Sequence, residues 1–367
     1  MSTSAAAAHR APRIGFVTQV DHTGIHAEGA AVTSSGMEEG IELFLTAEDL
    51  GYDTGYVRVR HLQDALSSPL LFLAAVGQRT RRIQLGTAVI PLRFENAGRL
   101  AEDLASADLL TGGRLRPGIS SGYSAHDAMY ARAFGALRDD RADHVDRVLH
   151  DLVSLLDGEI VAGADSHIEG VDPGAPLRMQ PRVPSLRNRL AYGAAGPQRA
   201  EMAGQLGLQL QLATMVPDDG SGRSFEELQL EVLTAYREAS RAAGFGDGTV
   251  MVSRQMVPVR SDAELERYVT LLPRERTADP RIVGEHHGQE IGGHDAVFSE
   301  VVLDEPAAVA RKLWEDPVVQ AADELALALP PGAPLVDQQS LLSTFARLVI
   351  PQLQMVLGRR GARPDRT

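Results

Sequence analysis

Short apolar runs alternate with amphipathic stretches along most of the chain. The runs favour strands and begin near residues 13, 54, 83, 115, 188, 208, 249 and 324. Between them, apolar positions recur at helical spacing, as at Ile41, Phe44 and Leu45, and Gly51 then supplies a helix stop. Strands that alternate with helices in this way indicate parallel pairing through crossover helices. Eight such units favour an α/β fold of the TIM (β/α)8 barrel class over an open sheet.

Two segments depart from this alternation. Glu159–Arg182 is rich in Gly and Pro, which predicts a hairpin-like insertion outside the barrel. Pro273–His294 is long, polar and glycine-rich, so we expect a loop over the carboxyl-terminal face. One barrel would then span residues 13–355, with a disordered tail at residues 1–12 and a flexible tail at residues 356–367.

Composition excludes several classes of function. The chain has 36 Lys and Arg against 49 Asp and Glu, a formal net charge of −13, which argues against nucleic acid or an anionic membrane as partner. Cysteine is absent, which removes disulfides, thiolate metal sites and thiol nucleophiles and fits a cytoplasmic protein. No apolar stretch approaches the roughly 20 residues of a membrane helix.

A cluster of possible metal ligands lies at Glu285, His286, His287, Glu290 and His294. Glycines before and between these residues, at positions 284, 288, 292 and 293, break any helix that could align their side chains. We therefore expect no metal site there.

Several motifs, taken in order, resemble the bacterial luciferase-like flavin-dependent monooxygenase family. They are GYDTGYVRVRHLQD at residues 51–64, RTRRIQLGTAVIPLRFENAGRLAEDLASADLLTGGRLRPGISSGY at residues 79–123, LAYGAAGPQRAEMAGQLG at residues 190–207 and FARLVIPQLQ at residues 345–354. The resemblance implies a TIM barrel that binds FMN, or in one branch the deazaflavin F420, at the carboxyl-terminal strand ends. It also implies that reduced flavin reacts with O2, and frequently a dimer.

The cofactor ring needs an apolar surface, which the strand end GTAVI supplies. The resemblance implies a non-proline cis peptide bond under the ring, which maps to Ala88 and Val89. The alternative is that both residues are ordinary barrel core.

Two loops of small residues precede predicted helices and could bind the flavin phosphate through free N–H groups. The residues are Ser120, Ser121 and Tyr123 in the first loop, and Gly193, Ala194, Ala195 and Gly196 in the second. The family often has hydroxyl side chains in the second loop, so here backbone amides would bind the phosphate together with the serines. The alternative is that both loops are ordinary helix caps.

His61 is the candidate catalytic residue. A Glu-His-His run of the family falls on Val59, Arg60 and His61, so only its second histidine is present. A neutral histidine can exchange protons near pH 7, whereas Arg60 would suit an anionic substrate or the charge of the flavin. If the strand stays regular, His61 faces one side and Arg60 the other. The alternative for His61 is a structural role at the barrel rim.

These observations predict an FMN-dependent monooxygenase that uses reduced flavin and O2 to oxidise a small organic substrate. A separate flavin reductase and a homodimer are the expected partners. Two alternatives remain open: an F420-dependent hydride-transfer oxidoreductase, which would not consume O2, and a non-catalytic flavin-binding protein.

Overall fold

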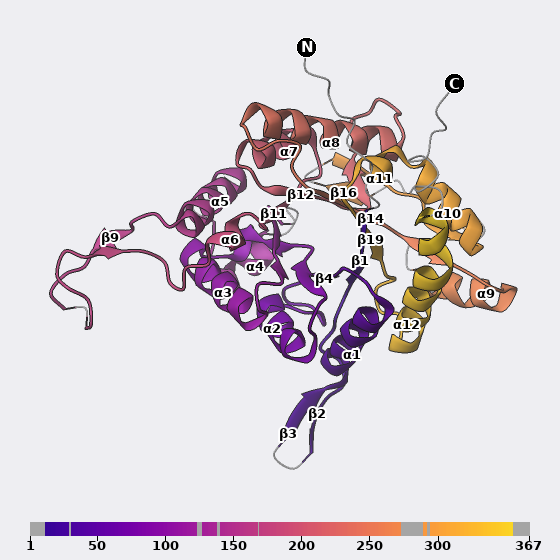
Figure 1. The fold of residues 1–367 in the computed structure, drawn as a ribbon, viewed down its shortest axis with the longest axis horizontal. Coiled ribbons are helices and arrows are strands. Elements are labelled where there is room, and N and C mark those ends of the chain that lie inside the picture. Colours follow the sequence, from indigo (N-terminus) through magenta and orange to yellow (C-terminus); the bar gives the residue numbers. More distant parts are fainter. Residues whose placement is uncertain are drawn as a thin grey trace, which may run out of the picture.

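The computed structural model describes residues 12–28, 31–122, 127–137, 140–167, 169–272, 289–291 and 294–354. Eight parallel strands curl around a common axis with helices outside them, which confirms the predicted barrel (Figure 1). In chain order they are β1 (Arg13–Thr18), β4 (Thr54–Val57), β5 with β6 (Gln84–Thr87 and Ile90–Pro91), β7 with β8 (Leu115–Arg116 and Gly118–Ser120), β11 (Ala191–Gly193), β12 (Gln209–Leu212), β14 (Val250–Arg254) and β19 (Glu324–Ala328).

The barrel closes at its third and fourth strands, each of which is interrupted. β5 pairs with β7 and β6 pairs with β8, so the two ends of the sheet order belong to the same two neighbouring strands. Pro117 separates β7 from β8 and has no N–H to donate. A side chain bridges this seam, since the Thr87 hydroxyl donates to the Gly118 carbonyl at 2.8 Å and accepts from the Gly118 N–H at 2.9 Å. The apolar run that begins near residue 83 therefore forms two strand segments, β5 and β6, rather than one.

Helices surround the sheet at the positions that the apolar spacing predicts. The principal ones are α1 (Ser35–Leu50), α2 (Pro69–Arg79), α3 (Ala97–Leu110), α5 (Arg141–Asp157), α7 (Pro197–Gln205), α8 (Phe225–Ala242), α9 (Asp262–Leu271), α10 (Pro306–Glu315) and α12 (Leu335–Thr344). Shorter helical segments are η1 (Leu92–Phe94), α4 (Asp127–Phe134), α6 (Pro184–Arg187), α11 (Pro317–Ala321) and the π-helical Phe345–Val349. Gly51 ends α1 with φ of 87°, a left-handed conformation that glycine adopts without a steric penalty.

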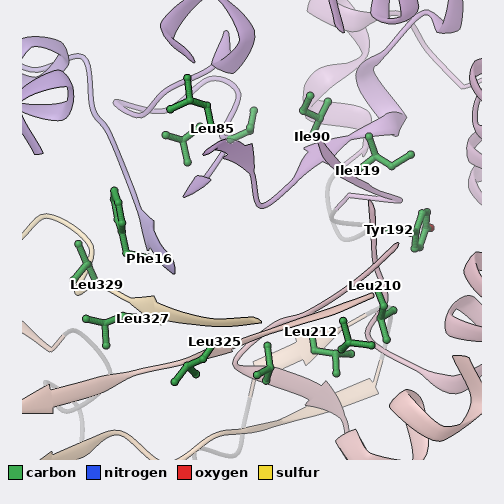
Figure 2. Close-up of a cluster of buried hydrophobic side chains, with 14 of the residues drawn as sticks. Phe16, Leu85, Ile90, Ile119, Tyr192, Leu210, Leu212, Leu325, Leu327 and Leu329 are labelled. Carbon is green, nitrogen blue, oxygen red and sulfur yellow. The ribbon is translucent and has the colours of Figure 1, made fainter. Parts of the chain in front are cut away.

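Two sets of apolar side chains pack on opposite faces of the sheet, because successive strand residues alternate in direction. The outer set includes Phe16, Leu85, Ile119, Tyr192, Leu210 and Leu325, and lies between strands and helices (Figure 2). The inner set consists of Val17, Tyr56, Met251 and Ala326, with Ala88 packed against it.

In the described part of the chain, four small sheets lie outside the barrel ladder. β9 (Ala162–Gly163) and β10 (Pro176–Leu177) form an antiparallel hairpin that projects from the body, which confirms the insertion in Glu159–Arg182 (Figure 1). β2 (Ile25–Glu28) and β3 (Ala31–Ser34) form a second hairpin that the sequence did not predict. The remaining pairs join β13 (Met215–Pro217) and β16 (Gln289–Ile291) to β17 (His294–Phe298), and β15 (Met256–Pro258) to β18 (Val302–Asp304).

Several predictions fall on residues that the structure does not describe. Of the loop expected at Pro273–His294, residues 273–288 and 292–293 lie outside the described part, and the rest belongs to β16 and the start of β17. The predicted tails also lie outside it, apart from Pro12. Within the described ranges, no helix is long and apolar enough to cross a membrane.

Candidate functional site

Three of the predicted cofactor residues meet at the carboxyl-terminal end of the barrel. A Cβ atom built on Gly193 would lie 3.0 Å from Val89 Cγ1 and 3.6 Å from Ser120 Cβ. Val89, Ser120 and Gly193 come from the third, fourth and fifth strand positions, so the parallel register brings them together. A side chain at residue 193 would crowd Val89, which explains why glycine fits there.

The peptide bond between Ala88 and Val89 is cis, as the resemblance implies. It lies where β5 ends and before β6 begins. Ala88 packs toward the barrel interior, and Val89 is half-buried at the rim. The rim of the third strand therefore presents small apolar groups rather than a regular strand edge.

The loop after β8 has a compact, polar backbone turn. The Gly122 N–H donates to Ser120 Oγ at 3.2 Å, and Gly122 has φ of 78°. Ser120 and Ser121 are half-buried, so their side chains are not wholly enclosed. Tyr123 lies outside the described residues, so its predicted role has no structural counterpart here.

The loop after β11 leads directly into α7. Ala194 is buried, Ala195 is half-buried, and Gly196 is the N-cap of α7 with no side chain capping the helix. A Cβ atom on Gly196 would have open space around it, with no heavy atom of the described residues within 4 Å. The first N–H groups of α7 have no intrahelical partner, and this is the arrangement that binds anions in proteins.

Two arginines and one aspartate that the sequence did not predict lie beside the first loop. Arg93 Nε and Arg141 Nη1 donate to opposite oxygens of Asp127, at 2.9 and 2.8 Å. Arg93 is only 2% exposed, and Arg141 also donates to the Ser121 carbonyl at 3.4 Å. Burial, before all other causes, lowers the pKa of the Arg141 guanidinium. This Arg93–Asp127–Arg141 cluster holds one positive charge in excess.

The sequence indicates only one member of this cluster. Arg93 follows the third strand almost immediately, where side chains reach the active face of a barrel. Asp127 and Arg141 come from the start of α4 and the start of α5, and nothing in their spacing indicates that they meet.

His61 lies within a group of aromatic rings. Its ring centroid is 4.9 Å from that of Phe94 and 4.8 Å from that of Phe134, both in edge-to-face geometry. Its Nε2 atom is buried and has no hydrogen-bond partner among the described residues. Burial lowers the pKa of the imidazole, so His61 is neutral near pH 7.

The strand does not stay regular as far as His61, so the condition for the expected alternation is not met. β4 ends at Val57, and the next residues form a loop in which the Arg60 N–H donates to the Leu66 carbonyl at 3.0 Å. Alternation along a regular strand therefore cannot decide whether Arg60 or His61 faces the barrel mouth. The ring contacts identify the surroundings of His61 instead.

Glu95 is a further titratable group that the sequence analysis did not single out. It follows Phe94 directly, and burial together with the nearby Asp103 carboxylate raises the pKa of Glu95 to about 7. Among the residues with described structure, no group of three or more His, Cys, Asp or Glu could hold a metal ion.

The chain belongs to the luciferase-like monooxygenase family, whose family model matches residues 13–322. One curated relative is 4-hydroxyprotoasukamycin monooxygenase of Streptomyces nodosus subsp. asukaensis, 32% identical over 170 residues that cover 46% of this chain and 44% of the relative. Another is F420-dependent glucose-6-phosphate dehydrogenase of Kribbella flavida, 26% identical over 291 residues that cover 71% of this chain and 85% of the relative.

A solved structure with the same fold is the oxygenating constituent of 3,6-diketocamphane monooxygenase from Pseudomonas putida, in complex with FMN. It superposes with a TM-score of 0.65 at 16% identity and covers 93% of this chain and 99% of that one. The protein is thus an enzyme of an oxidoreductase family that has both FMN-dependent and F420-dependent members.

Proposed function

We propose that this protein is an FMN-dependent monooxygenase that oxidises a small organic substrate with O2. The observation that carries the proposal is the close approach of Val89, Ser120 and Gly193 next to the open amino end of α7. A flavin needs an apolar surface for its ring and hydrogen-bond donors for its phosphate. Both are available here within one edge of the barrel.

The residues of this edge suit the two parts of FMN. Ala88 and Val89 would contact the ring. Backbone N–H groups after Pro197, with the hydroxyls of Ser120 and Ser121, would bind the phosphate. The excess charge of the Arg93–Asp127–Arg141 cluster favours a nearby anion. When bound, reduced FMN supplies the electrons with which O2 is activated.

The chain's own groups provide the rest of the chemistry. Neutral His61 can accept a proton from the substrate or return one, because its pKa is lowered by burial. The Phe94 and Phe134 rings lie against His61, whose Nε2 atom is buried, and exclusion of water from that atom limits side reactions of reactive intermediates.

The second candidate function is hydride transfer between F420 and an alcohol or sugar substrate. It is favoured by the F420-dependent dehydrogenase of Kribbella flavida, which matches over 71% of this chain. A non-catalytic flavin-binding role is the third, because Arg60 occupies the position of the family's first histidine.

The proposal includes two partners. One is a reductase that supplies reduced flavin, and the other is a second copy of the chain. Support for self-association comes from exposed apolar side chains on the neighbouring helices α2 and α3, namely Leu71, Leu109 and Leu110 at 75, 59 and 57% exposure. Light scattering after size-exclusion chromatography would measure the mass, and a monomer at micromolar concentration contradicts the dimer.

Cofactor binding tests the function directly. The purified chain is titrated with FMN, with riboflavin, which lacks the phosphate, and with F420. We expect FMN to bind and riboflavin to bind about tenfold more weakly, since the phosphate contacts are lost. O2 consumption is then followed with reduced FMN and candidate substrates. Saturation by F420 but not FMN would favour the dehydrogenase, and FMN binding without any substrate-dependent turnover would favour the non-catalytic role.

A further inference from the structure

Four aromatic rings gather at the carboxyl-terminal end of the barrel, and we call them the His61 ring cluster: His61, Phe94, Tyr130 and Phe134. Phe94 is its centre, with ring centroids at 4.9 Å from His61, 4.7 Å from Tyr130 and 5.0 Å from Phe134. The interplanar angles between Phe94 and these rings run from 47° to 70°. No pair is stacked face to face, and each of the four residues is only half-buried.

The cluster is assembled from three separate elements. His61 follows β4, Phe94 ends η1, and Tyr130 and Phe134 lie one helical turn apart on α4. α4 contributes no fully buried residue, so apolar packing alone holds it weakly. Its position depends on Arg93, which binds Asp127 at the start of α4 at 2.9 Å and the Gly135 carbonyl just after its end at 3.1 Å.

The cluster contains an unsatisfied polar atom. His61 Nε2 is covered by its neighbours and has no hydrogen-bond partner in the described part of the chain. A buried polar atom without a partner costs free energy, which a ligand that supplies a hydrogen bond would recover. Because His61 is neutral, Nε2 accepts a hydrogen bond in the tautomer that carries its proton on Nδ1.

We propose that the His61 ring cluster is the substrate subsite of this enzyme and takes a planar aromatic ring bearing a hydroxyl group. This inference rests on the proposed function, since it names the substrate class of the same site. The substrate ring would pack against Phe94 and the α4 rings in offset or edge-to-face geometry. Its hydroxyl would donate to His61 Nε2 when the weakly held α4 rings shift off that atom. Several aromatic walls with one convergent polar group are typical of small-molecule sites.

The alternative occupant, an aliphatic chain of similar size, gains the same burial but no ring-to-ring interaction. A saturated alcohol can also donate to His61, so the ring and the hydroxyl have to be tested separately. Three probes do this: 4-ethylphenol, its saturated counterpart 4-ethylcyclohexanol, and 4-ethylanisole, which keeps the ring but cannot donate a hydrogen bond.

Binding of each probe is measured by isothermal titration calorimetry on the full chain, with and without saturating FMN. We expect 4-ethylphenol to bind about tenfold more tightly than either other probe. Phe94→Leu and Tyr130→Leu each remove one ring while keeping apolar bulk. Each should weaken the binding of 4-ethylphenol about fivefold. His61→Phe keeps an aromatic wall and should abolish the preference for 4-ethylphenol over 4-ethylanisole.

The matched control is Phe245→Leu, which changes an exposed aromatic side chain beyond the far end of α8 and should leave all three affinities unchanged. Thermal unfolding of each variant verifies the fold, and Tyr130→Leu serves if Phe94→Leu does not fold. Equal affinity for 4-ethylphenol and 4-ethylcyclohexanol overturns the inference, as does the absence of probe binding in protein that binds FMN. Probe binding in protein that binds neither FMN nor F420 would keep the subsite and reject the proposed function.

Discussion

Tyr56 donates a hydrogen bond of 2.9 Å to Glu324 at the amino-terminal end of the barrel interior. The other carboxylate oxygen of Glu324 lies 3.0 Å from Arg13 Nη2, so the first, second and eighth strands are joined through one side chain. Burial raises the pKa of Glu324, and Arg13 opposes part of that rise. In a TIM barrel this end serves stability rather than catalysis.

Replacement of Glu324 should therefore affect the fold and not the reaction. Glu324→Ala removes the acceptor of Tyr56 and the partner of Arg13, and we expect it to lower the free energy of unfolding by about 3 kcal/mol. Glu324→Gln keeps an acceptor and removes a desolvated charge, so its loss should be smaller by about 2 kcal/mol. Urea unfolding measures both, and equal losses would contradict this account.

Gly196 provides a test of the phosphate site that leaves the fold intact. Gly196→Asp and Gly196→Asn both fit the open space and both can cap α7. Only aspartate brings negative charge toward the expected phosphate. Gly196→Asp should weaken FMN binding about tenfold, whereas Gly196→Asn should change the affinity little. The two affinities are measured by flavin fluorescence titrations. Equal values would contradict phosphate binding at this loop.

His61 and Arg60 are expected to differ in their effect on turnover. His61→Ala should leave FMN affinity and melting temperature nearly unchanged while it reduces substrate oxidation about 10²-fold, the usual loss for a positioned acid or base. Arg60→Ala should have the smaller kinetic effect. Steady-state rates of both variants decide the assignment, which full activity of His61→Ala together with inactive Arg60→Ala would reverse.

The Glu95 carboxyl gives stability a predictable pH dependence. Its pKa of about 7 in the folded protein lies above the value in the unfolded chain, so the folded state binds more protons between about pH 4.5 and 7. This contribution to stability is present at low pH and is lost as pH rises through 7. Glu95→Gln should raise the melting temperature by a few degrees at pH 8 relative to the native chain and by less at pH 5. Melting curves at the two pH values measure this, and an equal change at both contradicts it.

The barrel could be predicted from sequence because each strand begins where a run of strand-forming residues meets a helix stop or a turn. The positions at which the strands end could not be predicted. Beyond Leu212 and Arg254 the apolar pattern continues, yet the chain leaves the barrel ladder and enters the small sheets through β13 and β15. The local pattern of apolar residues indicates burial but not the sheet that a strand joins, because residues in those small sheets are buried as well.

The candidate site was predictable only where it follows strand ends. Val89, Ser120 and Gly193 could be found because parallel strands bring their carboxyl ends to one edge. The rings around His61 could not, since Phe94 and Phe134 belong to other elements and their meeting depends on how Arg93 positions α4. Such contacts have no periodic signature in the chain.

The Thr87 hydroxyl that bridges the barrel seam also bears on local opening of the molecule. The Gly118 amide is bound to a side chain rather than to the backbone of the next strand, so its protection from hydrogen exchange depends on one rotamer. Exchange there should be faster than at the centres of β14 and β19, whose ladder is unbroken. The seam, which lies next to the residues that would contact the flavin, should thus open more readily than β14 and β19.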